Sequence, residues 1–117
     1  MEVGLLKLNH INLAVSDVVV AADFLEKYFG MVRVGGDEKF TVMFDSDHLV
    51  LSLMKHGPAV KYPGSFHIGF GQPDHESVNR IYQQLKDDGF DVNPPEQHHA
   101  WTFYVQAPGG FTVEVMA

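Results

Sequence analysis

The chain has 117 residues, of which 45% are hydrophobic, and a formal net charge of −7, values typical of one ordinary soluble domain with its own core. Its eight lysines and arginines stand singly, so no basic stripe follows a phosphate backbone, and we expect no nucleic-acid partner. The absence of cysteine excludes disulfides, thiolate metal ligands and cysteine nucleophiles.

The apolar runs are too short to predict a membrane span. One of the longest, residues 18–22, falls far short of the roughly 20 residues that a bilayer requires. The start MEVGLLKLNH also lacks the basic region and the cleavage site of a signal peptide. We therefore expect no membrane association and a cytoplasmic location.

The first half of the chain predicts a strand, a helix and three further strands. LNHINLAV predicts the first strand, and Asp17 after it marks the start of an amphipathic helix that ends at Gly30. Three β-like runs follow, MVRV, KFTVMF and HLVLSLM, separated by a glycine pair and an Asp-Ser-Asp turn. Residues 1–55 thus form one βαβββ module.

The second half repeats this order after a linker. The polar stretch HGPAVKYPG, residues 56–64, predicts no regular element. SFHIGF then predicts a strand, Asp74 starts a helix that ends at Gly89, and FDV, WTFYVQ and FTVEVM predict three strands. Residues 65–117 form the second module. We expect a single α+β domain over residues 1–117.

Two histidines occupy equivalent places in the two modules, since Asp17 follows His10 by seven residues and Asp74 follows His67 by seven. Glu114 lies in the last strand, where a carboxylate facing a protein interior is costly without a partner. Two histidines and one carboxylate are the ligands of non-haem iron and related sites. Although a lone histidine in a strand is more often a core residue, the repeat predicts that His10, His67 and Glu114 bind one divalent ion, either Fe, Mn, Ni or Zn.

The expected lining of this site combines polar and large apolar side chains. Their inward direction follows from strand parity, so a shift of one residue would reverse it. The apolar members indicate a planar or hydrophobic small-molecule ligand. The polar members are Asn12, Ser52 and Thr102, and the apolar members are Met43, Phe44 and Trp101.

Two further histidines, His98 and His99, precede the strand WTFYVQ. One of them, with His99 as the chosen candidate, is in a place to act as a general acid or base near neutral pH. The alternative is an exposed pair in a loop, which is the more common situation for such residues.

The chain resembles the vicinal oxygen chelate superfamily, which includes glyoxalase I, extradiol dioxygenases, fosfomycin-resistance thiol transferases and bleomycin-binding proteins. The resemblance lies in LNHINLAVSD with ADFLEKYFGM, in SFHIGF and in FYVQAPGGFTVEVM, which together span nearly the whole chain. It implies two βαβββ modules wrapped into an open, metal-lined β-barrel, and a homodimer. Both a barrel within one chain and a barrel made by exchanging modules between chains are compatible with the sequence.

The resemblance also implies roles for single residues. Ser52 stands where glyoxalase-like members carry a glutamate ligand, so three protein ligands remain and other positions stay open for substrate or dioxygen. Tyr104 stands where related transferases and dioxygenases often carry a cavity tyrosine that donates a hydrogen bond near the metal. Pro94, His98 and His99 replace the lysine and serines of the fosfomycin transferases, which argues against that activity.

Three functions are compatible with these features. The first is a metal-dependent enzyme that chelates two oxygens of a small molecule, as a dioxygenase with Fe(II) or as a lyase or transferase with Mn(II), Ni(II) or Zn(II). The second is a glyoxalase I-like lyase, although Ser52 replaces its carboxylate. The third is a metal-free protein that sequesters a small molecule, as bleomycin-resistance proteins do. The charge of −7 fits the third function, but the retained His, His and Glu set does not.

Overall fold

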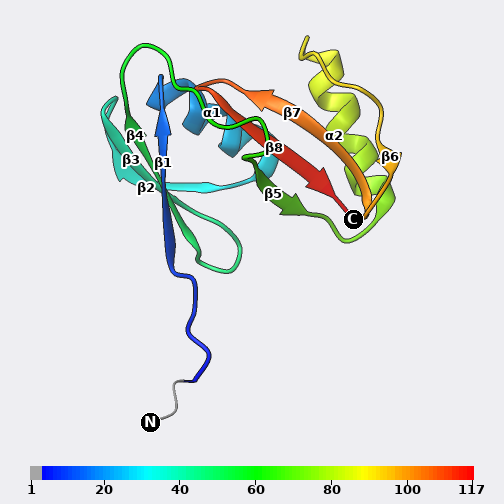
Figure 1. The fold of residues 1–117 in the computed structure, drawn as a ribbon, viewed down its shortest axis with the longest axis horizontal. Helices are drawn as coiled ribbons and strands as arrows, with labels where there is room; N and C mark the ends of the chain where they lie inside the picture. Colours follow the sequence, from blue (N-terminus) through cyan, green and yellow to red (C-terminus); the bar gives the residue numbers. More distant parts are fainter. Residues whose placement is uncertain (1–3) are drawn as a thin grey trace.

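The computed structural model describes residues 4–117, and residues 1–3 of the predicted first module lie outside the described part (Figure 1). The elements of the first half are β1 (His10–Val15), α1 (Val18–Phe29), β2 (Val32–Gly36), β3 (Phe40–Phe44) and β4 (Val50–Lys55). Those of the second half are β5 (Ile68–Gly71), α2 (His75–Asp87), β6 (Glu96–Gln97), β7 (Trp101–Ala107) and β8 (Phe111–Met116). The linker between them, residues 56–64, contains no helix or strand.

Both halves have the same strand order. One four-stranded sheet runs β1-β4-β3-β2 and the other runs β5-β8-β7-β6. In each sheet the first and last strands of the module pair in parallel, and the other pairs are antiparallel. Within residues 4–117 no strand pairing joins the two sheets. The predicted α+β class and the repeated βαβββ order are confirmed.

The helices begin and end at the residues that the sequence marks. The side chains of Asp17 and Asp74 each accept a hydrogen bond from the backbone N–H three residues later, at 3.1 and 2.8 Å, which satisfies a free donor of the first turn. Gly30 and Gly89 follow the helices with φ of 65° and 92°. Glycine favours this left-handed region because it has no Cβ.

The strand that follows α2 differs from the prediction. FDV, residues 90–92, forms no strand, and β6 is the short pair Glu96–Gln97. Pro94 and Pro95 stand directly before it, and a proline has no N–H to donate to a strand ladder. The chain therefore reaches the sheet edge only after the prolines and remains irregular before them.

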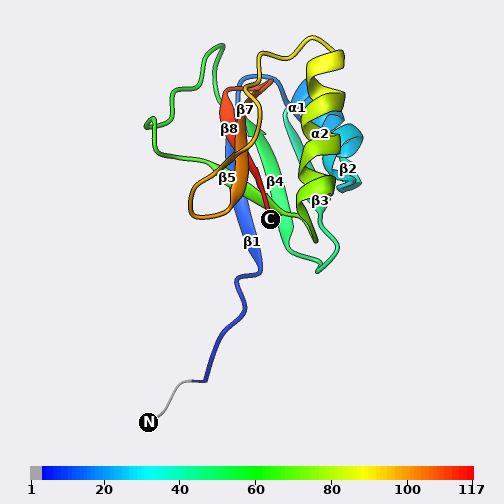
Figure 2. The ribbon, with the colours of Figure 1, turned by 90° about the vertical axis from the view of Figure 1, so that its right-hand side faces the viewer.

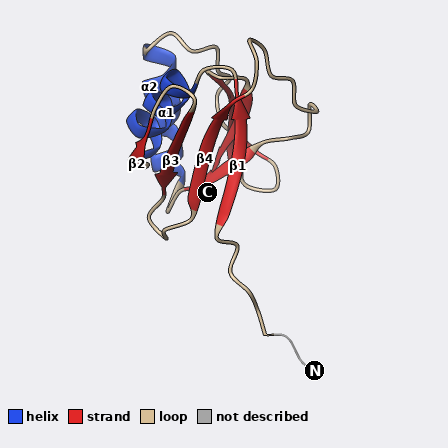
Figure 3. Cartoon of the chain, turned by 90° about the vertical axis from the view of Figure 1, so that its left-hand side faces the viewer, coloured by secondary structure: helices blue, strands red, loops and turns tan. Residues whose placement is uncertain are grey.

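The helices cover one face of the sheets, and the opposite face carries no helix (Figures 2 and 3). Strand residues that face the helices form the core, and Leu13, Leu53, Phe111 and Val113 are almost completely inaccessible. Neither helix in the described part of the chain is long and apolar enough to cross a membrane. The face without helices, called here the open face, carries most of the polar strand residues.

Helix α1 connects the two modules. The ring of Phe29, the last residue of α1, stacks on the ring of Phe70 in β5, and the ring centroids lie 4.2 Å apart. The Tyr28 hydroxyl donates a hydrogen bond of 2.6 Å to Asp88, just beyond α2. Packing across the modules through one helix fixes the two sheets side by side, since apolar surface on both is buried by the same element.

The segment before β1 lies apart from this core. Residues 4–9 extend away from both sheets and form no helix or strand (Figure 1). Leu5, Leu6 and Leu8 in this segment are highly exposed. Such a run of exposed leucines is unusual for the surface of a monomeric protein.

Candidate metal centre

The open face of the second sheet gathers polar groups around one buried carboxylate. Glu114 on β8 is 4% exposed and pairs in register with Tyr104 on β7. Thr102 lies on the same face, two residues before Tyr104. His67, just before β5, and His99, just before β7, complete the group. These five residues are called the Glu114 cluster.

One carboxylate oxygen of Glu114 is held by two donors. Its Oε2 accepts a 2.6 Å hydrogen bond from the hydroxyl of Thr102 and a 2.7 Å hydrogen bond from Nε2 of His99. Because an ionised carboxylate only accepts, Nε2 of His99 must carry the proton. Both distances lie within the short range typical of charge-assisted hydrogen bonds.

The other carboxylate oxygen faces His67. The Nδ1 atom of His67 lies 3.0 Å from the backbone carbonyl of Ser65, which can only accept, so Nδ1 carries a proton. In the neutral ring the lone pair is then on Nε2, which lies 3.3 Å from Oε1 of Glu114. The two atoms lie close enough to share a proton or to bind one cation. A neutral imidazole and a carboxylate are suitable ligands for Fe, Mn, Ni or Zn.

The surroundings of Glu114 shift its pKa in opposing directions. Burial of the carboxyl raises its pKa, but interactions with Thr102, His99 and Tyr104 lower it more, so the pKa of Glu114 lies below its usual value. The pKa of Tyr104 is raised, first by burial and then by the neighbouring Glu114. At neutral pH the cluster thus presents an ionised carboxylate beside a protonated phenol.

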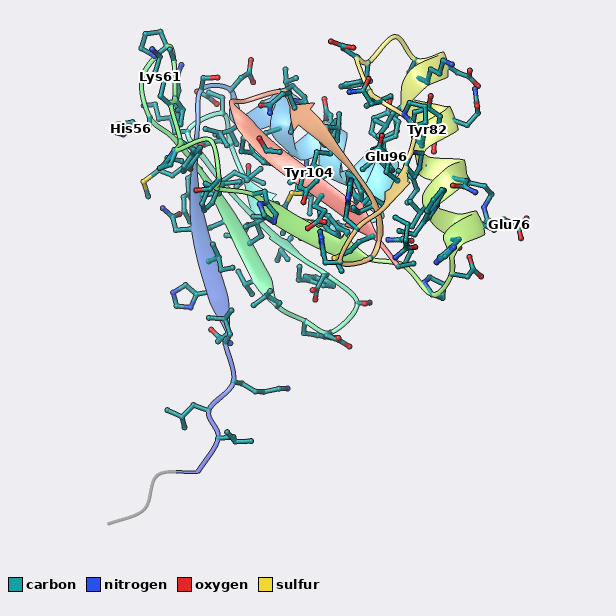
Figure 4. The ribbon with its side chains drawn as sticks, turned by 45° about the vertical axis from the view of Figure 1, so that its right-hand side comes forward. His56, Lys61, Glu76, Tyr82, Glu96 and Tyr104 are labelled. Carbon is teal, nitrogen blue, oxygen red and sulfur yellow. The ribbon has the colours of Figure 1, made fainter. Side chains whose placement is uncertain are left out.

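Tyr104 also contacts the histidine of the cluster. Its ring lies edge-on to that of His67, with centroids 5.5 Å apart and an interplanar angle of 88°. The side chain remains partly exposed on the open face of β7, where Figure 4 labels it. Its hydroxyl is therefore within reach of both the cluster and a molecule bound from solvent.

The first sheet holds a separate polar group. His10, Asn12 and Ser52 share one face, because His10 pairs with Val50 and Asn12 with Ser52 in the parallel register. The Ser52 hydroxyl donates a 2.7 Å hydrogen bond to Oδ1 of Asn12. His10 is exposed, and its Nδ1 lies 3.1 Å from the side-chain oxygen of Asn9.

The three predicted metal ligands do not meet within one chain. Among residues 4–117, no group of three His, Asp or Glu side chains is placed to hold a metal ion. The chain brings His67 and Glu114 together but leaves His10 on the other sheet. The structure thus contains two of the three predicted ligands as a pair, with His99 on the far oxygen of the carboxylate.

Two predicted cavity residues lie elsewhere. Met43 is 0% exposed and belongs to the core on the helix side of its sheet, so its prediction as a cavity wall is wrong. Trp101 packs against α2, where its ring stacks on His75 and its Nε1 donates a 2.8 Å hydrogen bond to Asn79. It therefore points away from Thr102, the next residue in β7, and its predicted place in the wall is also wrong.

A cavity of about 340 Å³ adjoins the cluster through Thr102 and Tyr104. No lysine or arginine lines it, and the Glu96 carboxylate lies 3.0 Å from Nε2 of His98, within hydrogen-bond distance. Glu96 is a lining residue that was not predicted, because the strand after the second helix was expected at residues 90–92, although the charged residue in PEQHH was a usable signal. The lining residues are Asn93, Pro94, Glu96, His98, Thr102, Phe103 and Tyr104.

Three comparisons with known proteins bear on this site. The profile described as Glyoxalase/Bleomycin resistance protein/Dioxygenase superfamily matches residues 7–115. A comparison with curated proteins gives no match. Among solved structures, a Bacillus cereus protein described as "a possible Glyoxalase" is 54% identical, with a TM-score of 0.91, and the match covers 97% of this chain and 100% of that one.

Less similar structures share the fold. The lactoylglutathione lyase of Agrobacterium tumefaciens is 18% identical over 94% of this chain and 92% of its own, with a TM-score of 0.76. The fosfomycin resistance protein FosX of Listeria monocytogenes, in complex with Mn(II) and sulfate, is 22% identical over 100% of this chain and 91% of its own, with a TM-score of 0.78. From the profile match and the Bacillus cereus relative, we conclude that the chain belongs to the glyoxalase/bleomycin resistance protein/dioxygenase superfamily.

Proposed function

We propose that this protein is an enzyme that binds one divalent metal ion, Fe, Mn, Ni or Zn, through His67 and Glu114 and acts on a small molecule. The observation that carries the proposal is the 3.3 Å distance between Nε2 of His67 and Oε1 of the buried Glu114, with Nδ1 of His67 engaged by the Ser65 carbonyl. Ligands around one first-row metal ion are separated by similar distances, since each lies roughly 2.0–2.2 Å from the ion. The Mn(II) in the FosX complex gives the proposal support from a structure of the same fold.

When bound, the metal ion would act as a Lewis acid that chelates two oxygens of the substrate. The residues of the chain would bind and orient that substrate. The protonated hydroxyl of Tyr104 is placed to donate a hydrogen bond to a substrate oxygen. The neighbouring cavity would hold the rest of the molecule against Asn93 and Glu96.

We further propose that His10 reaches the site from a second copy of the chain. His10 is exposed on β1, which lies at the free end of its sheet, and the exposed segment 4–9 leads into it. A free strand edge and exposed leucines favour pairing with another chain. In a twofold dimer each copy would give His10 to its partner and receive one in return, which yields two equivalent sites.

The reaction is either oxygen-dependent cleavage, as in a dioxygenase with Fe(II), or a lyase or transferase reaction with another metal. A glyoxalase I-like lyase is a less favoured variant, because Ser52 has no carboxylate and its hydroxyl is bonded to Asn12. The second candidate function is metal-free binding of a small molecule. The acidic cavity and the net charge of −7 favour that function for a cationic ligand.

Activity screening of metal-loaded protein tests the enzyme proposal. Protein loaded separately with Fe(II), Mn(II), Ni(II) and Zn(II) is incubated with catechols, 2-oxoaldehyde–thiol adducts and epoxides. We expect turnover of one class with one of the metals, abolished in Glu114→Gln and reduced in Tyr104→Phe. Metal-independent binding of a ligand that survives Glu114→Gln, without turnover of any class, would favour the sequestering function instead.

A further inference from the structure

We infer that His99 and Thr102 are positioning residues that fix the Glu114 carboxylate so that Oε1 alone is offered to the metal ion. This inference rests on the proposed metal site. The two oxygens of Glu114 then have different roles, since Oε2 is held by hydrogen bonds and Oε1 binds the metal ion. His99 then has a role other than the acid–base role expected from the sequence.

The hydrogen bonds are divided unequally between the two oxygens. Oε2 of Glu114 accepts from both Thr102 and His99, at 2.6 and 2.7 Å. Oε1 faces His67 at 3.3 Å, a longer distance than the about 2.7–2.9 Å of a charge-assisted N–H to carboxylate bond. The carboxylate thus has one oxygen saturated by donors and the other turned to a ligand atom.

The elements around Glu114 hold the two donors in place. Thr102 is 3% exposed and lies in β7 on the same face as Glu114, so its hydroxyl has little freedom to turn elsewhere. His99 stands at the tip of a tight connection between β6 and β7, where the His98 N–H donates to the Ala100 carbonyl at 2.9 Å. The neighbouring side chains of His98 and His99 point to different partners, because His98 contacts Glu96 and His99 contacts Glu114.

This arrangement has a chemical consequence. A free carboxylate can bind a metal with both oxygens, whereas hydrogen bonds that occupy the lone pairs of one oxygen favour binding through the other. One-oxygen binding leaves more positions on the ion for substrate. Hydrogen bonds to a ligating carboxylate also fix its orientation, and their loss typically lowers metal affinity or activity about 10–100-fold.

Binding of Mn(II) by the full-length protein tests the inference. The dissociation constant and the bound-ion spectrum are measured by electron paramagnetic resonance for the parent, His99→Ala and Thr102→Val. We expect each variant to bind Mn(II) about 10–100-fold more weakly than the parent, with an altered spectrum. Thr102→Ser and His99→Gln, which keep a donor, should restore most of the affinity. His98→Ala is the matched control and should bind like the parent, because His98 contacts Glu96.

The outcomes separate the inference from the proposed function. If the parent binds Mn(II) and loses it in His67→Ala, while His99→Ala and Thr102→Val keep parental affinity and spectrum, the inference is overturned and the metal site stands. If the parent binds none of Mn(II), Fe(II) and Zn(II), both fail, and His67 and Glu114 share a proton instead. Thermal unfolding confirms that each variant is folded, and His99→Ala is the safer variant because its side chain is half exposed.

Discussion

The Nε2 atom of His67 faces the Oε1 atom of Glu114 across 3.3 Å, between the end of the linker and the last strand of the fold. The Ser65 carbonyl binds Nδ1 of His67 at 3.0 Å and leaves Nε2 as the ring nitrogen near the carboxylate. Thr102 and His99 occupy the other oxygen. An imidazole nitrogen and a buried carboxylate oxygen at this separation suit two ligands of one first-row metal ion.

The core position of Met43 predicts its effect on stability. Met43→Ala should lower the free energy of unfolding by about 2–5 kcal/mol, because it removes a fully buried side chain and leaves a cavity. Met54→Ala is the control: Met54 is 45% exposed on the same sheet, and its loss should cost less than about 1 kcal/mol. Urea unfolding measures both. If Met43→Ala kept the stability of the parent but lost ligand binding, Met43 would line the cavity and not the core.

Strand parity explains which site residues could be predicted. Met43 and Phe44 are neighbours in β3 and face opposite sides, so both cannot line one cavity. Trp101 and Thr102 are likewise neighbours in β7 and face opposite sides of the sheet. The choice between the two faces depends on where the helices pack, and that information lies outside the strand itself.

The fold was more predictable than the site because its signals are local. Apolar periodicity and the caps Asp17 and Asp74 locate the helices, whereas Pro94 and Pro95 delay β6. His99 contacts Glu114, 15 residues later, from the connection between β6 and β7, whose path follows no periodic pattern. Contacts of that kind depend on tertiary structure.

The contact between Tyr28 and Asp88 predicts a pH-dependent effect on stability. The hydrogen bond from Tyr28, followed by that from Lys27, lowers the pKa of Asp88. A carboxyl with a lowered folded pKa stabilises the fold above its unfolded pKa of about 3.9, and this contribution is lost as the pH falls through the folded value. Tyr28→Phe should therefore lower the urea midpoint at pH 7 and lower it less in acid.

Tyr82→Phe is the control for this prediction, because the Tyr82 ring packs edge-on against Phe103 and changes little when its hydroxyl is removed. Urea midpoints of the parent and both variants are compared at pH 7 and at about pH 3.5, below the usual carboxyl pKa. An equal loss of stability in Tyr28→Phe at both values would show that Asp88 ionisation is not involved.

The cavity beside the cluster predicts weak binding of anions. No lysine or arginine follows Lys86 in the chain, and Glu96 lines the cavity. Methylphosphonate should therefore bind poorly to Mn(II)-loaded protein. Asn93→Lys should tighten binding roughly fivefold, the equivalent of about 1 kcal/mol for one charge pair near 4 Å in water.

Calorimetric titration measures this difference, and His56→Lys on the distant linker (Figure 4) is the matched control for added charge. The control should bind methylphosphonate like the parent. Tight binding by the parent, or equal gains in both lysine variants, would contradict the assigned role of the cavity.

A site shared between two chains predicts complementation. His10→Ala and Glu114→Ala should each bind metal weakly when alone. When the two variants are mixed under conditions that exchange subunits, half of the dimers are mixed and each contains one intact site. Metal binding of parental affinity should then return at about a quarter of the sites, given a twofold dimer.

Fluorescence or paramagnetic titration of the mixture counts these sites, with a mixture of His67→Ala and Glu114→Ala as the control. His67 and Glu114 of one site come from the same chain, so no dimer in this control mixture contains an intact site and metal binding should not return. If the first mixture also restores none although subunits exchange, His10 is not supplied by a partner.

The most direct test of the metal site is the metal content of protein purified without chelator, measured by elemental mass spectrometry. The parent is compared with His67→Ala and with His56→Ala, a histidine on the linker away from the Glu114 cluster. We predict close to one equivalent of a first-row divalent metal per chain in the parent and in His56→Ala, and almost none in His67→Ala. Absence of metal from all three, even after incubation with Fe(II), Mn(II), Ni(II) and Zn(II), or equal content in all three, would contradict a metal site at His67 and Glu114.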